Sequence, residues 1–370
     1  GAVLEQVSEA LERLGLVGQE REAKLLYLAV TSRIFPRPVN VAVKGSSSAG
    51  KSVLVSKVLK LFPPEASYEL SAMSEKALAY SEEPLSHRFL VLYEAAGVNS
   101  DFAQYLARTL LSEGCVRYET VEKQKDGKLV CRLIERPGPT GFITTTTAIA
   151  LHPENETRIL SVEVDDSPEQ TARVLLRQGR EAAGEVEPTP DLTPWHAFQT
   201  LLTVNPPEVV VPFAPHLAQN CDAEALRLRR DFMQVLTLIK AHAALHAHLR
   251  ERDDQGRVMA HLEDYEAVYP LIAEVIARGT GGQVDPRLRQ VWDVVKKEAD
   301  EDGLTVRNIA RLTGLPETTT SRLVKKATQA GFLVNLETRH RARARLVTGD
   351  PIPPDGMVLP TPEVVQKNFL

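Results

Sequence analysis

Cysteine is scarce in this sequence, and long apolar runs are absent. The three cysteines, Cys115, Cys131 and Cys221, are odd in number and lack CxxC spacing, which argues against a disulfide framework and a structural zinc site. We expect them to be reduced packing residues. No stretch of about eighteen apolar residues lacks a charge, and no apolar segment follows a basic start, so neither a membrane span nor a signal peptide is expected. The sequence predicts a cytoplasmic protein without a membrane partner.

An excess of charge of one sign is also lacking. The 370 residues carry a formal net charge of −5, with 25% charged and 43% hydrophobic residues, which is ordinary for a globular protein of two or three domains. A protein that binds nucleic acid over its whole surface is therefore not expected. Basic residues nevertheless outnumber acidic ones between Arg287 and Arg345, so positive charge is concentrated toward the carboxyl end.

The first half of the chain alternates the apolar patterns of helices and strands. Helices are expected over 3–14 and 20–34, and a β-branched run at 39–43 is followed by a Ser/Gly loop and a helical pattern at 51–61. Beyond these, the pattern predicts a helix at 101–112 and strands at 89–92, 115–121, 129–134, 142–147 and 159–164. This alternation predicts an α/β fold, a mostly parallel sheet with helices on its faces.

The second half is mainly helical and is interrupted by proline and glycine. A proline-rich connection at 185–215 contains one short helix around 195–202 and leads to long helices at 222–250 and 262–278. Gly279–Gly282 is typical of a flexible joint. The expected divisions are leading helices at 1–35, an α/β core at 36–184, a linker and helical lid at 185–280, a basic domain at 281–350 and an extended tail at 351–370.

One segment matches the phosphate-binding pattern GxxxxGK[ST]. It follows an expected strand and opens an expected helix, which is the context that the pattern requires. Small residues let backbone N–H groups converge on phosphates, Lys51 would reach the terminal phosphates of ATP, and the Ser52 hydroxyl would bind Mg²⁺. The alternative is a Ser/Gly loop with an accidental lysine. The nucleotide-binding residues are expected to be Gly45, Ser46, Ser47, Ser48, Ala49, Gly50, Lys51 and Ser52.

The expected strand at 89–92 ends beside an acidic residue, Glu94. A carboxylate at the C-terminal end of a buried strand orients the attacking water and lies near the metal in many ATPases, so Glu94 is a candidate catalytic and metal-binding residue. Many such proteins carry Asp before this Glu, but here the residue is Tyr93, which leaves metal coordination mainly to Ser52, phosphates and waters. The alternative is that Glu94 caps a helix at the surface.

The order of these segments resembles that of AAA+ motors related to the MCM replicative helicases and to the helicase or primase-helicase proteins of phages and mobile elements. The resemblance covers about residues 15–175. It begins with Leu16–Lys24 and continues after Glu94 with Leu110–Gly114, two strands, Gly141–Thr147 and Asn155–Leu160. It implies a P-loop AAA+ core of three α/β/α layers with a helical lid.

This resemblance implies that the polar turn between the strands at 115–121 and 129–134 is a hairpin that grips DNA. Lys123, Lys125 and Lys128 would then contact phosphates without regard to sequence. The alternative is a solvated hairpin whose lysines keep it soluble.

The resemblance also implies two catalytic residues after the hairpin. Thr146, within the run Thr144–Thr147, would be the sensor of the γ-phosphate, at a position where the family usually has Asn; the alternative is a plain strand former. Arg158 would be the arginine finger that acts on the ATP of a neighbouring subunit, against an exposed salt-bridge arginine. A finger in trans implies a homo-oligomer, which we expect to be a hexameric ring.

Two further pairs lie on expected helices. Arg227 and Arg230 share a helix face, and either is a candidate contact from the lid to ATP, against simple lid packing. His242 and His246 have the i,i+4 spacing of a metal-binding face. Because no acidic partner stands in HExxH form, an ordinary amphipathic helix is the preferred interpretation.

Residues 304–326 have the pattern of a helix, a turn and a second helix, with Gly314 in the turn and Pro316 at the start of the second helix. The pattern is similar to winged-helix domains, which also end many MCM-type helicases, and RHRARAR at 339–345 alternates like a wing. Protein contact is the alternative to DNA binding. The residues expected to face DNA are Thr319, Thr320, Arg322, Lys325, Lys326, Arg341 and Arg343.

The sequence therefore predicts an ATPase with two main interpretations. The first is an ATP- and Mg²⁺-dependent DNA helicase or translocase that acts in replication on single-stranded or forked DNA. The second is an ATP-switched initiator, loader or regulator that binds DNA without unwinding it; a defence or signalling NTPase is a third, weaker option. Gly1 in place of Met leaves room for a primase or another replication domain before this fragment.

Overall fold

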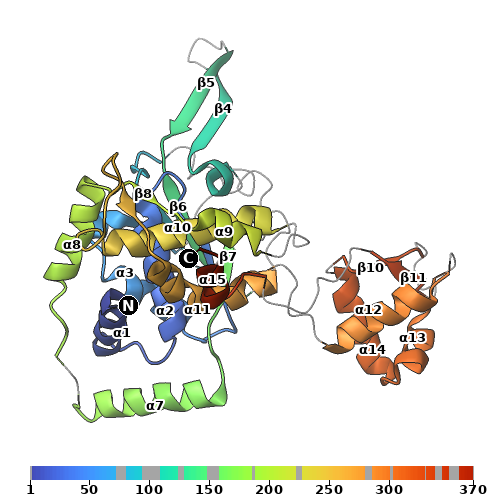
Figure 1. Ribbon diagram of the computed structural model, residues 1–370. Coiled ribbons are helices and arrows are strands. Elements are labelled where there is room, and N and C mark those ends of the chain that lie inside the picture. Colours follow the sequence, from blue (N-terminus) through green and yellow to red (C-terminus); the bar gives the residue numbers. More distant parts are fainter. Residues whose placement is uncertain are drawn as a thin grey trace. The chain divides into compact units, whose positions relative to one another are not determined.

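Two compact units make up the computed structural model (Figure 1). Of the described residues, those within 2–221, 227–276 and 359–369 belong to the first unit, and those within 277–358 to the second. The structure describes residues 2–71, 81–93, 109–123, 129–147, 158–185, 188–221, 227–279, 286–300, 303–329, 331–337, 344–349 and 358–369.

A five-stranded parallel sheet is the centre of the first unit, and it confirms the predicted α/β fold. Its order is β2-β3-β6-β1-β7, and every neighbouring pair is parallel. The inner strands are apolar and buried on both faces, as parallel strands require. The strands are β1 (Val41–Lys44), β2 (Ser67–Leu70), β3 (Arg88–Leu92), β6 (Thr140–Thr146) and β7 (Leu160–Glu163).

Helices of the first part of the chain pack beside this sheet. They are α1 (Ala2–Arg13), α2 (Glu20–Thr31), the short 3-10 helices η1 (Ser32–Ile34) and η2 (Pro64–Ala66), and α3 (Lys51–Leu59). The residues of α2 from Leu25 to Thr31 are all buried, because α1, α3 and a later helix surround it.

Helix α7 (Pro168–Ala182) follows β7 and has no counterpart in the sequence prediction. The Ser167 hydroxyl accepts a hydrogen bond from the Gln170 N–H, and Pro168 occupies the first turn, which together start the helix. Only Gln170 is buried, while Leu175 and Leu176 are exposed. The start signal was present in the sequence, but α7 has no buried apolar stripe to complete the pattern.

A helical subdomain completes the first unit. It contains α8 (Thr193–Val204), α9 (Ala214–Gln219), α10 (Leu228–Leu245), α11 (Leu262–Gly279) and two short parallel strands, β8 (Val209–Val210) and β9 (Val258–Met259).

Arg33 fastens α8 to the helices beside the sheet. Its guanidinium is buried and donates to the Gln199 side chain at 2.9 Å and to the Thr203 hydroxyl at 3.0 Å. Burial lowers the pKa of Arg33 to about 10. A buried cation held by neutral oxygens fixes the position of α8, because breaking these hydrogen bonds would leave the buried charge without hydrogen-bond partners.

A buried polar cluster joins α10 to α11. Asp264 lies 2.7 Å from His242 Nδ1 and accepts further hydrogen bonds from Arg250 at 2.7 Å and from the His261 N–H. His246 directly follows α10, one turn after His242, and the three side chains His242, His246 and Asp264 have the donor atoms of a metal site. Because the Arg250 guanidinium already neutralises Asp264, the geometry favours a structural hydrogen-bond cluster.

We predict that Asp264→Asn lowers the free energy of unfolding by about 3 kcal/mol at pH 7, because Arg250 then loses its buried carboxylate partner and keeps only the exposed Glu263 at 3.4 Å. Burial raises the pKa of Asp264, but the hydrogen bonds from His242, His261 and Arg250 outweigh it and leave the pKa below its ordinary value. The stabilisation is therefore present above about pH 4 and is lost as the pH falls through the lower, folded-state pKa. Urea unfolding of both proteins across pH 3 to 7 measures this, and curves separated by a constant amount at all pH values would contradict it.

A two-stranded antiparallel hairpin projects from the sheet (Figure 1). It consists of β4 (Val116–Lys123) and β5 (Leu129–Arg136), and its base packs on the core through Val116, Tyr118 and Ile134. This confirms the predicted pair of strands, each slightly longer than expected.

The second unit is a winged helix. Its elements are α12 (Pro286–Glu298), α13 (Val306–Thr313), α14 (Glu317–Gln329), β10 (Leu333–Asn335) and β11 (Leu346–Thr348). Leu304 forms an antiparallel bridge with Leu346, which extends the β10-β11 ribbon. Gly314 ends α13 with a φ of 71°, a conformation that glycine adopts without strain. The predicted helix, turn and helix are thus confirmed.

The end of the chain differs from the expected extended tail. Pro362–Phe369 form α15, which packs against α9 with Leu359 and Val365 buried. The Tyr265 hydroxyl donates to the Pro360 carbonyl at 2.6 Å. Val365 is the buried apolar residue of this short helix, and the prolines before it obscured the helical pattern.

The structure also bears on the expectations about membrane spans and cysteines. None of the helices in the described ranges has the length and apolarity needed to cross a membrane. The cysteines are free thiols, but Cys131 is exposed on β5, so the expectation that all three pack inside the protein is wrong for this residue.

Candidate nucleotide-binding site

The loop Gly45–Gly50 connects β1 to α3 at the C-terminal edge of the sheet. A Cβ on Gly45 would lie 2.5 Å from Cγ2 of Val164, the residue that follows β7, so a larger residue at position 45 would clash unless Val164 moved. Gly50 has a φ of 87° directly before α3, and no described atom lies within 4 Å of where its Cβ would be. The glycines therefore allow a tight turn that leaves the N-terminus of α3 open, as phosphate binding requires.

Lys51 lies at the mouth of this loop. Its side chain is largely buried, and its ammonium group donates to the carbonyl oxygens of Gly45 at 3.1 Å and Ser46 at 2.6 Å. Ser52 follows in the first turn of α3 and is exposed, as are Ser46, Ser47 and Ser48. The eight loop residues predicted for nucleotide binding, Gly45–Ser52, thus form one turn at the start of α3.

Thr146 lies beside the loop because of the strand register. β6 is the neighbour of β1, and Thr146 pairs with Lys44, the residue before Gly45. The Thr144 hydroxyl is committed to β3, since it donates to the Leu92 carbonyl at 3.0 Å. Of these threonines, Thr146 is therefore placed at the edge where the loop begins.

Glu94 lies outside the described residues, but the residue before it has a defined partner. The Tyr93 hydroxyl donates to Glu69 Oε2 on β2 at 2.6 Å. Burial raises the pKa of Tyr93, and the adjacent Glu69 carboxylate raises it further. Since β6 separates β3 from β1, this hydrogen bond holds the phenol toward the outer strand, away from the loop. The position that carries a metal-associated Asp in many ATPases is occupied here by a neutral, anchored tyrosine.

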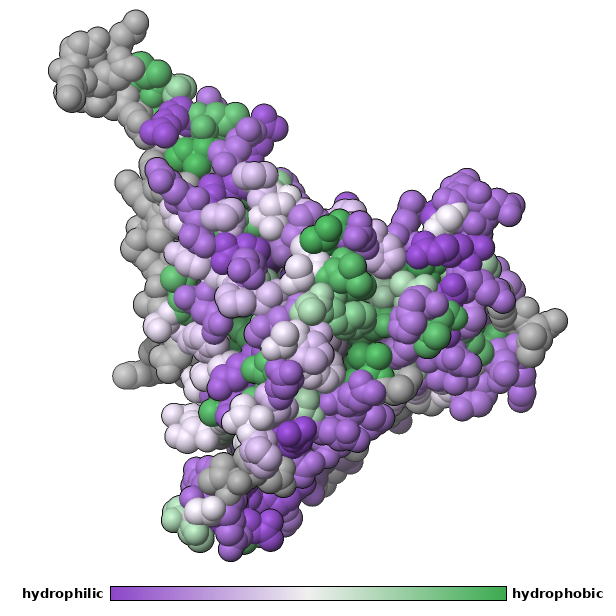
Figure 2. All heavy atoms as spheres, turned by 90° about the vertical axis from the view of Figure 1, so that its left-hand side faces the viewer, coloured by the Kyte–Doolittle hydropathy of each residue, from purple (hydrophilic) through white to green (hydrophobic). Residues whose placement is uncertain are grey.

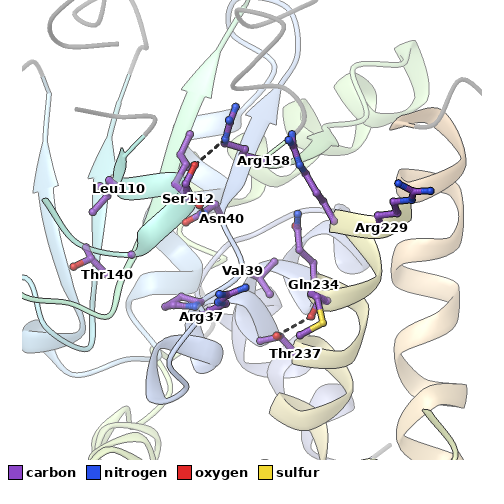
Figure 3. A pocket seen from close by; sticks show the side chains of 15 residues that line it. Arg37, Val39, Asn40, Leu110, Ser112, Thr140, Arg158, Arg229, Gln234 and Thr237 are labelled. Carbon is purple, nitrogen blue, oxygen red and sulfur yellow. Dashed lines mark hydrogen bonds between the residues drawn. The ribbon is translucent and has the colours of Figure 1, made fainter. Parts of the chain in front are cut away.

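Arg158 lies at the opposite edge of the sheet. It precedes β7, and its Nε donates to the Ser112 hydroxyl at 2.8 Å (Figure 3). The same edge holds the starts of β1 and β6, joined by Asn40, whose side chain accepts from the Phe142 N–H at 2.9 Å. At about 3.3 Å per residue, the parallel strands put the two edges roughly 15 Å apart. Arg158 therefore does not reach the loop of its own chain.

A cavity of about 390 Å³ opens beside Arg158. Four arginines line it: Arg37 from the segment before β1, Arg158, and Arg229 and Arg230 from the start of α10. In Figure 3, Arg158 lies beside the sheet, and Arg229 extends from α10 on the side away from Arg158. This cavity is called the arginine pocket below; the sequence prediction had named Arg158 and Arg230, but neither Arg37 nor Arg229.

Arg227 and Arg230 lie at this same edge and not at the Gly45–Ser52 loop. Arg227 donates to Asp231 at 3.0 Å and to the Ile159 carbonyl at 3.4 Å, which ties α10 to the start of β7. Burial raises the pKa of Asp231 to about 6, although Arg227 opposes the shift. The fold therefore does not bring either arginine to the Gly45–Ser52 loop of its own chain, because the helical lid is attached at the opposite edge of the sheet.

The hairpin lysines are only partly placed. Lys123 ends β4, while Lys125 and Lys128 lie outside the described residues. The sequence analysis did not identify the exposed apolar residues on the two strands of the hairpin. Val121, Leu129 and Leu133 are 57%, 67% and 47% exposed. Figure 2 shows apolar side chains gathered on this projecting ribbon. The available signal was the adjacent apolar residues of β5, Leu129 with Val130 and Leu133 with Ile134, because one buried face of a strand accounts for only every second residue.

The winged helix presents a basic helix surface. On α14, Arg322, Lys325 and Lys326 are exposed, as expected. Thr320 is fully buried and donates to the Pro316 carbonyl at 3.1 Å, so the prediction that it faces DNA is wrong. Arg341 and Arg343 lie outside the described residues.

Two family models match the chain. The model described as the MTBMA_p00010 P-loop domain matches residues 1–208, and the model described as the IclR helix-turn-helix domain matches residues 298–337. The matched segments hold the Gly45–Ser52 loop in the first case and α13 and α14 in the second. They support a P-loop α/β core followed by a winged helix.

One solved structure and the curated proteins complete the comparison. The chain is similar to a full-length MCM homologue from Methanopyrus kandleri, with 15% sequence identity and a TM-score of 0.45. The similarity covers 75% of this chain and 59% of that one, so the chain spans less than two thirds of the homologue. A search of the curated proteins finds no match.

Proposed function

Since the chain belongs to the MTBMA_p00010 P-loop domain family, we propose that it hydrolyses ATP at the Gly45–Ser52 loop and uses the energy to move along or remodel DNA. One observation carries the proposal: the loop joins a buried parallel strand to the N-terminus of α3, with Lys51 at its mouth. This geometry directs backbone N–H groups, a helix dipole and an ammonium group at one point, which suits a triphosphate.

Each residue around the loop would have its own part in ATP hydrolysis. Lys51 neutralises charge on the terminal phosphates, and its two carbonyl contacts already hold it at the loop. Thr146 offers a hydroxyl at the same edge, and Glu94, which follows β3, polarises the attacking water. Ser52 and Glu94 would hold Mg²⁺, which supplies positive charge to the phosphate oxygens when bound. Because Tyr93 brings no second carboxylate, the metal would depend on Ser52, Glu94 and the phosphates.

The arginine pocket implies a homo-oligomer. Arg158 and Arg230 lie at the sheet edge remote from their own loop, so their guanidinium groups serve an ATP molecule only if it belongs to a neighbouring copy. Head-to-tail contacts of this kind close into rings, and we propose a hexameric ring. Each ATP would then lie between the loop of one copy and the arginines of the next.

DNA is the proposed partner of the hairpin and of the winged helix. Lys123, Lys125 and Lys128 would contact the phosphate backbone from the hairpin, and α14 would enter a groove with Arg322 and Lys325 on its exposed face. Arg341 and Arg343 would reach the phosphates from the wing.

The experiment that tests this function measures ATP hydrolysis with and without single-stranded DNA, together with the mass of the protein in a non-hydrolysable ATP analogue. We expect hydrolysis that DNA stimulates and a mass several times that of one chain. Strand displacement on forked DNA then separates the two interpretations. A helicase unwinds the fork, whereas an ATP-switched initiator or loader binds the fork and leaves it paired. No hydrolysis in any condition would overturn the proposal.

We predict that Arg322→Ala with Lys325→Ala weakens binding of duplex DNA by tenfold or more and reduces the salt dependence of affinity by about one unit for each lost phosphate contact. Lys297→Ala is the matched control, because Lys297 is an exposed lysine of α12 in the same unit. Fluorescence anisotropy at several salt concentrations measures both quantities. Equal affinities for the double variant and the control would argue that this unit contacts protein.

A further inference from the structure

The winged helix is an insertion in the first unit. The chain leaves the first unit near the end of α11, forms the elements from α12 to β11, and returns to the first unit with residues 359–369. In Figure 1 the carboxyl end of the chain lies among the helices of the first unit. The winged helix is therefore attached to the first unit at two points of the chain, one before α12 and one after β11.

The second attachment is held by buried contacts, which we call the α15 anchor. Leu359 and Val365 are 1% and 0% exposed, and α15 packs against α9. The Tyr265 hydroxyl, on α11, donates to the Pro360 carbonyl at 2.6 Å, and Tyr265 is itself buried. Domains joined by one short linker usually move relative to each other, whereas a second attachment restricts rotation about the first. The rotation of the winged helix is therefore restricted as long as the α15 anchor holds.

Contacts within the first unit lead from the α15 anchor to the sheet. Tyr265 directly follows Asp264, whose carboxylate lies 2.7 Å from His242 of α10. Consecutive residues of α11 therefore hold the chain after the winged helix and the helix that begins the lid. Arg227, the N-cap of α10, donates to the carbonyl of Ile159, directly before β7, at 3.4 Å. The anchor is thus linked through α11 and α10 to the edge where β7 starts.

Strand β7 continues this connection to the nucleotide loop. It runs parallel to β1, from the edge that holds Ile159 to the edge that holds the loop. Val164, which follows β7, already packs so closely that a Cβ on Gly45 would lie 2.5 Å from it. Because close-packed interiors transmit small shifts, a nucleotide that moves the loop also displaces the end of β7. Described contacts therefore join the Gly45–Ser52 loop to the α15 anchor.

We infer that the α15 anchor has a regulatory role, in which nucleotide bound at the Gly45–Ser52 loop changes the affinity of the winged helix for DNA. The inference rests on the proposed function, because it takes ATP as the ligand of the loop and DNA as the ligand of α14. A winged helix of restricted rotation loses less orientational freedom when it binds, so a change at the anchor changes affinity. Coupling between two sites is reciprocal and typically amounts to about fivefold or more in affinity.

Val365→Asp tests the inference, because a carboxylate without a partner at this buried position releases α15. Fluorescence anisotropy measures binding of a labelled DNA duplex to the full chain, with and without a non-hydrolysable ATP analogue. The analogue is expected to change the affinity of the wild-type protein by about fivefold or more, and that of Val365→Asp by less than about twofold. Val364→Asp is the matched control, because Val364 is the neighbouring valine of α15 and is 41% exposed. It should keep the wild-type response.

A milder variant keeps the test decisive if Val365→Asp does not fold. Tyr265→Phe removes only the hydroxyl that binds the Pro360 carbonyl and keeps the buried ring. It is expected to weaken the response to the analogue while its thermal unfolding stays near the wild-type temperature.

Two results would overturn the inference. One is a response to the analogue in the folded anchor variants that equals the response of Val364→Asp. The other is a wild-type protein that binds the analogue in a titration but binds the duplex equally with and without it. Both results leave ATP hydrolysis by the wild-type protein intact, so the proposed function survives them. A wild-type protein that does not bind the analogue contradicts the proposed function itself, and the inference with it.

Discussion

Lys51→Ala is expected to reduce ATP hydrolysis by about 100-fold or more. The ammonium group lies at the mouth of the Gly45–Ser52 loop, held by two loop carbonyls, and it is the only cation that the described part of the loop supplies. Removing a preorganised charge from a site where negative charge develops typically costs two to three orders of magnitude, on the order of 3 to 4 kcal/mol. Steady-state release of phosphate at saturating ATP measures the effect.

Lys60→Ala is the matched control for this variant. Lys60 lies at the C-terminal end of the same helix, is exposed, and is remote from the loop. Its substitution should leave the rate within about twofold of the wild-type rate. Hydrolysis by Lys51→Ala at the wild-type rate would show that ATP is cleaved elsewhere or not by this protein.

Arg158→Ala is the second change with a large expected effect, a loss of about 10³-fold in the rate of hydrolysis. The guanidinium lies at the edge of the sheet opposite the loop and is oriented by Ser112. The loss should therefore be in catalysis by the assembled protein, with little change in ATP binding to the single chain. Hydrolysis rates across protein concentrations, with nucleotide binding measured in parallel, test both parts.

Arg180→Ala, an exposed arginine of α7, is the control for the loss of one arginine. A rate for Arg158→Ala within a few fold of this control would mean that Arg158 is a surface arginine. A loss of ATP affinity in Arg158→Ala at high dilution would instead mean that it acts within its own chain.

The nucleotide loop and the sheet could be predicted because their signals are local. The glycines of Gly45–Ser52 and the β-branched residues before them specify a strand, a turn and a helix without reference to the rest of the chain. The winged helix was predictable for the same reason, since Gly314 and Pro316 mark its turn. Thr320 shows the limit: its helix was predicted, but which face is buried depends on packing against α12 and α13.

The arginine pocket could not be predicted as a unit. Arg37, Arg158 and Arg229 are far apart in the sequence and meet only because β1 and β7 start at the same edge and α10 returns to it. Arg227 and Arg230 were predicted as candidate contacts from the lid to ATP, but the sequence does not reveal to which edge of the sheet the lid is attached. The pairing of His242 with Asp264 across two helices was hidden for the same reason.

The measurement that tests the account most directly mixes two inactive proteins, Lys51→Ala and Arg158→Ala. In the mixture, an Arg158→Ala chain with an intact loop can lie next to a Lys51→Ala chain with an intact arginine. ATP between them has a complete site. The account predicts hydrolysis well above the sum of the two separate rates, rising with protein concentration. A mixture no more active than its components, while wild-type protein hydrolyses ATP under the same conditions, would contradict a site shared between copies.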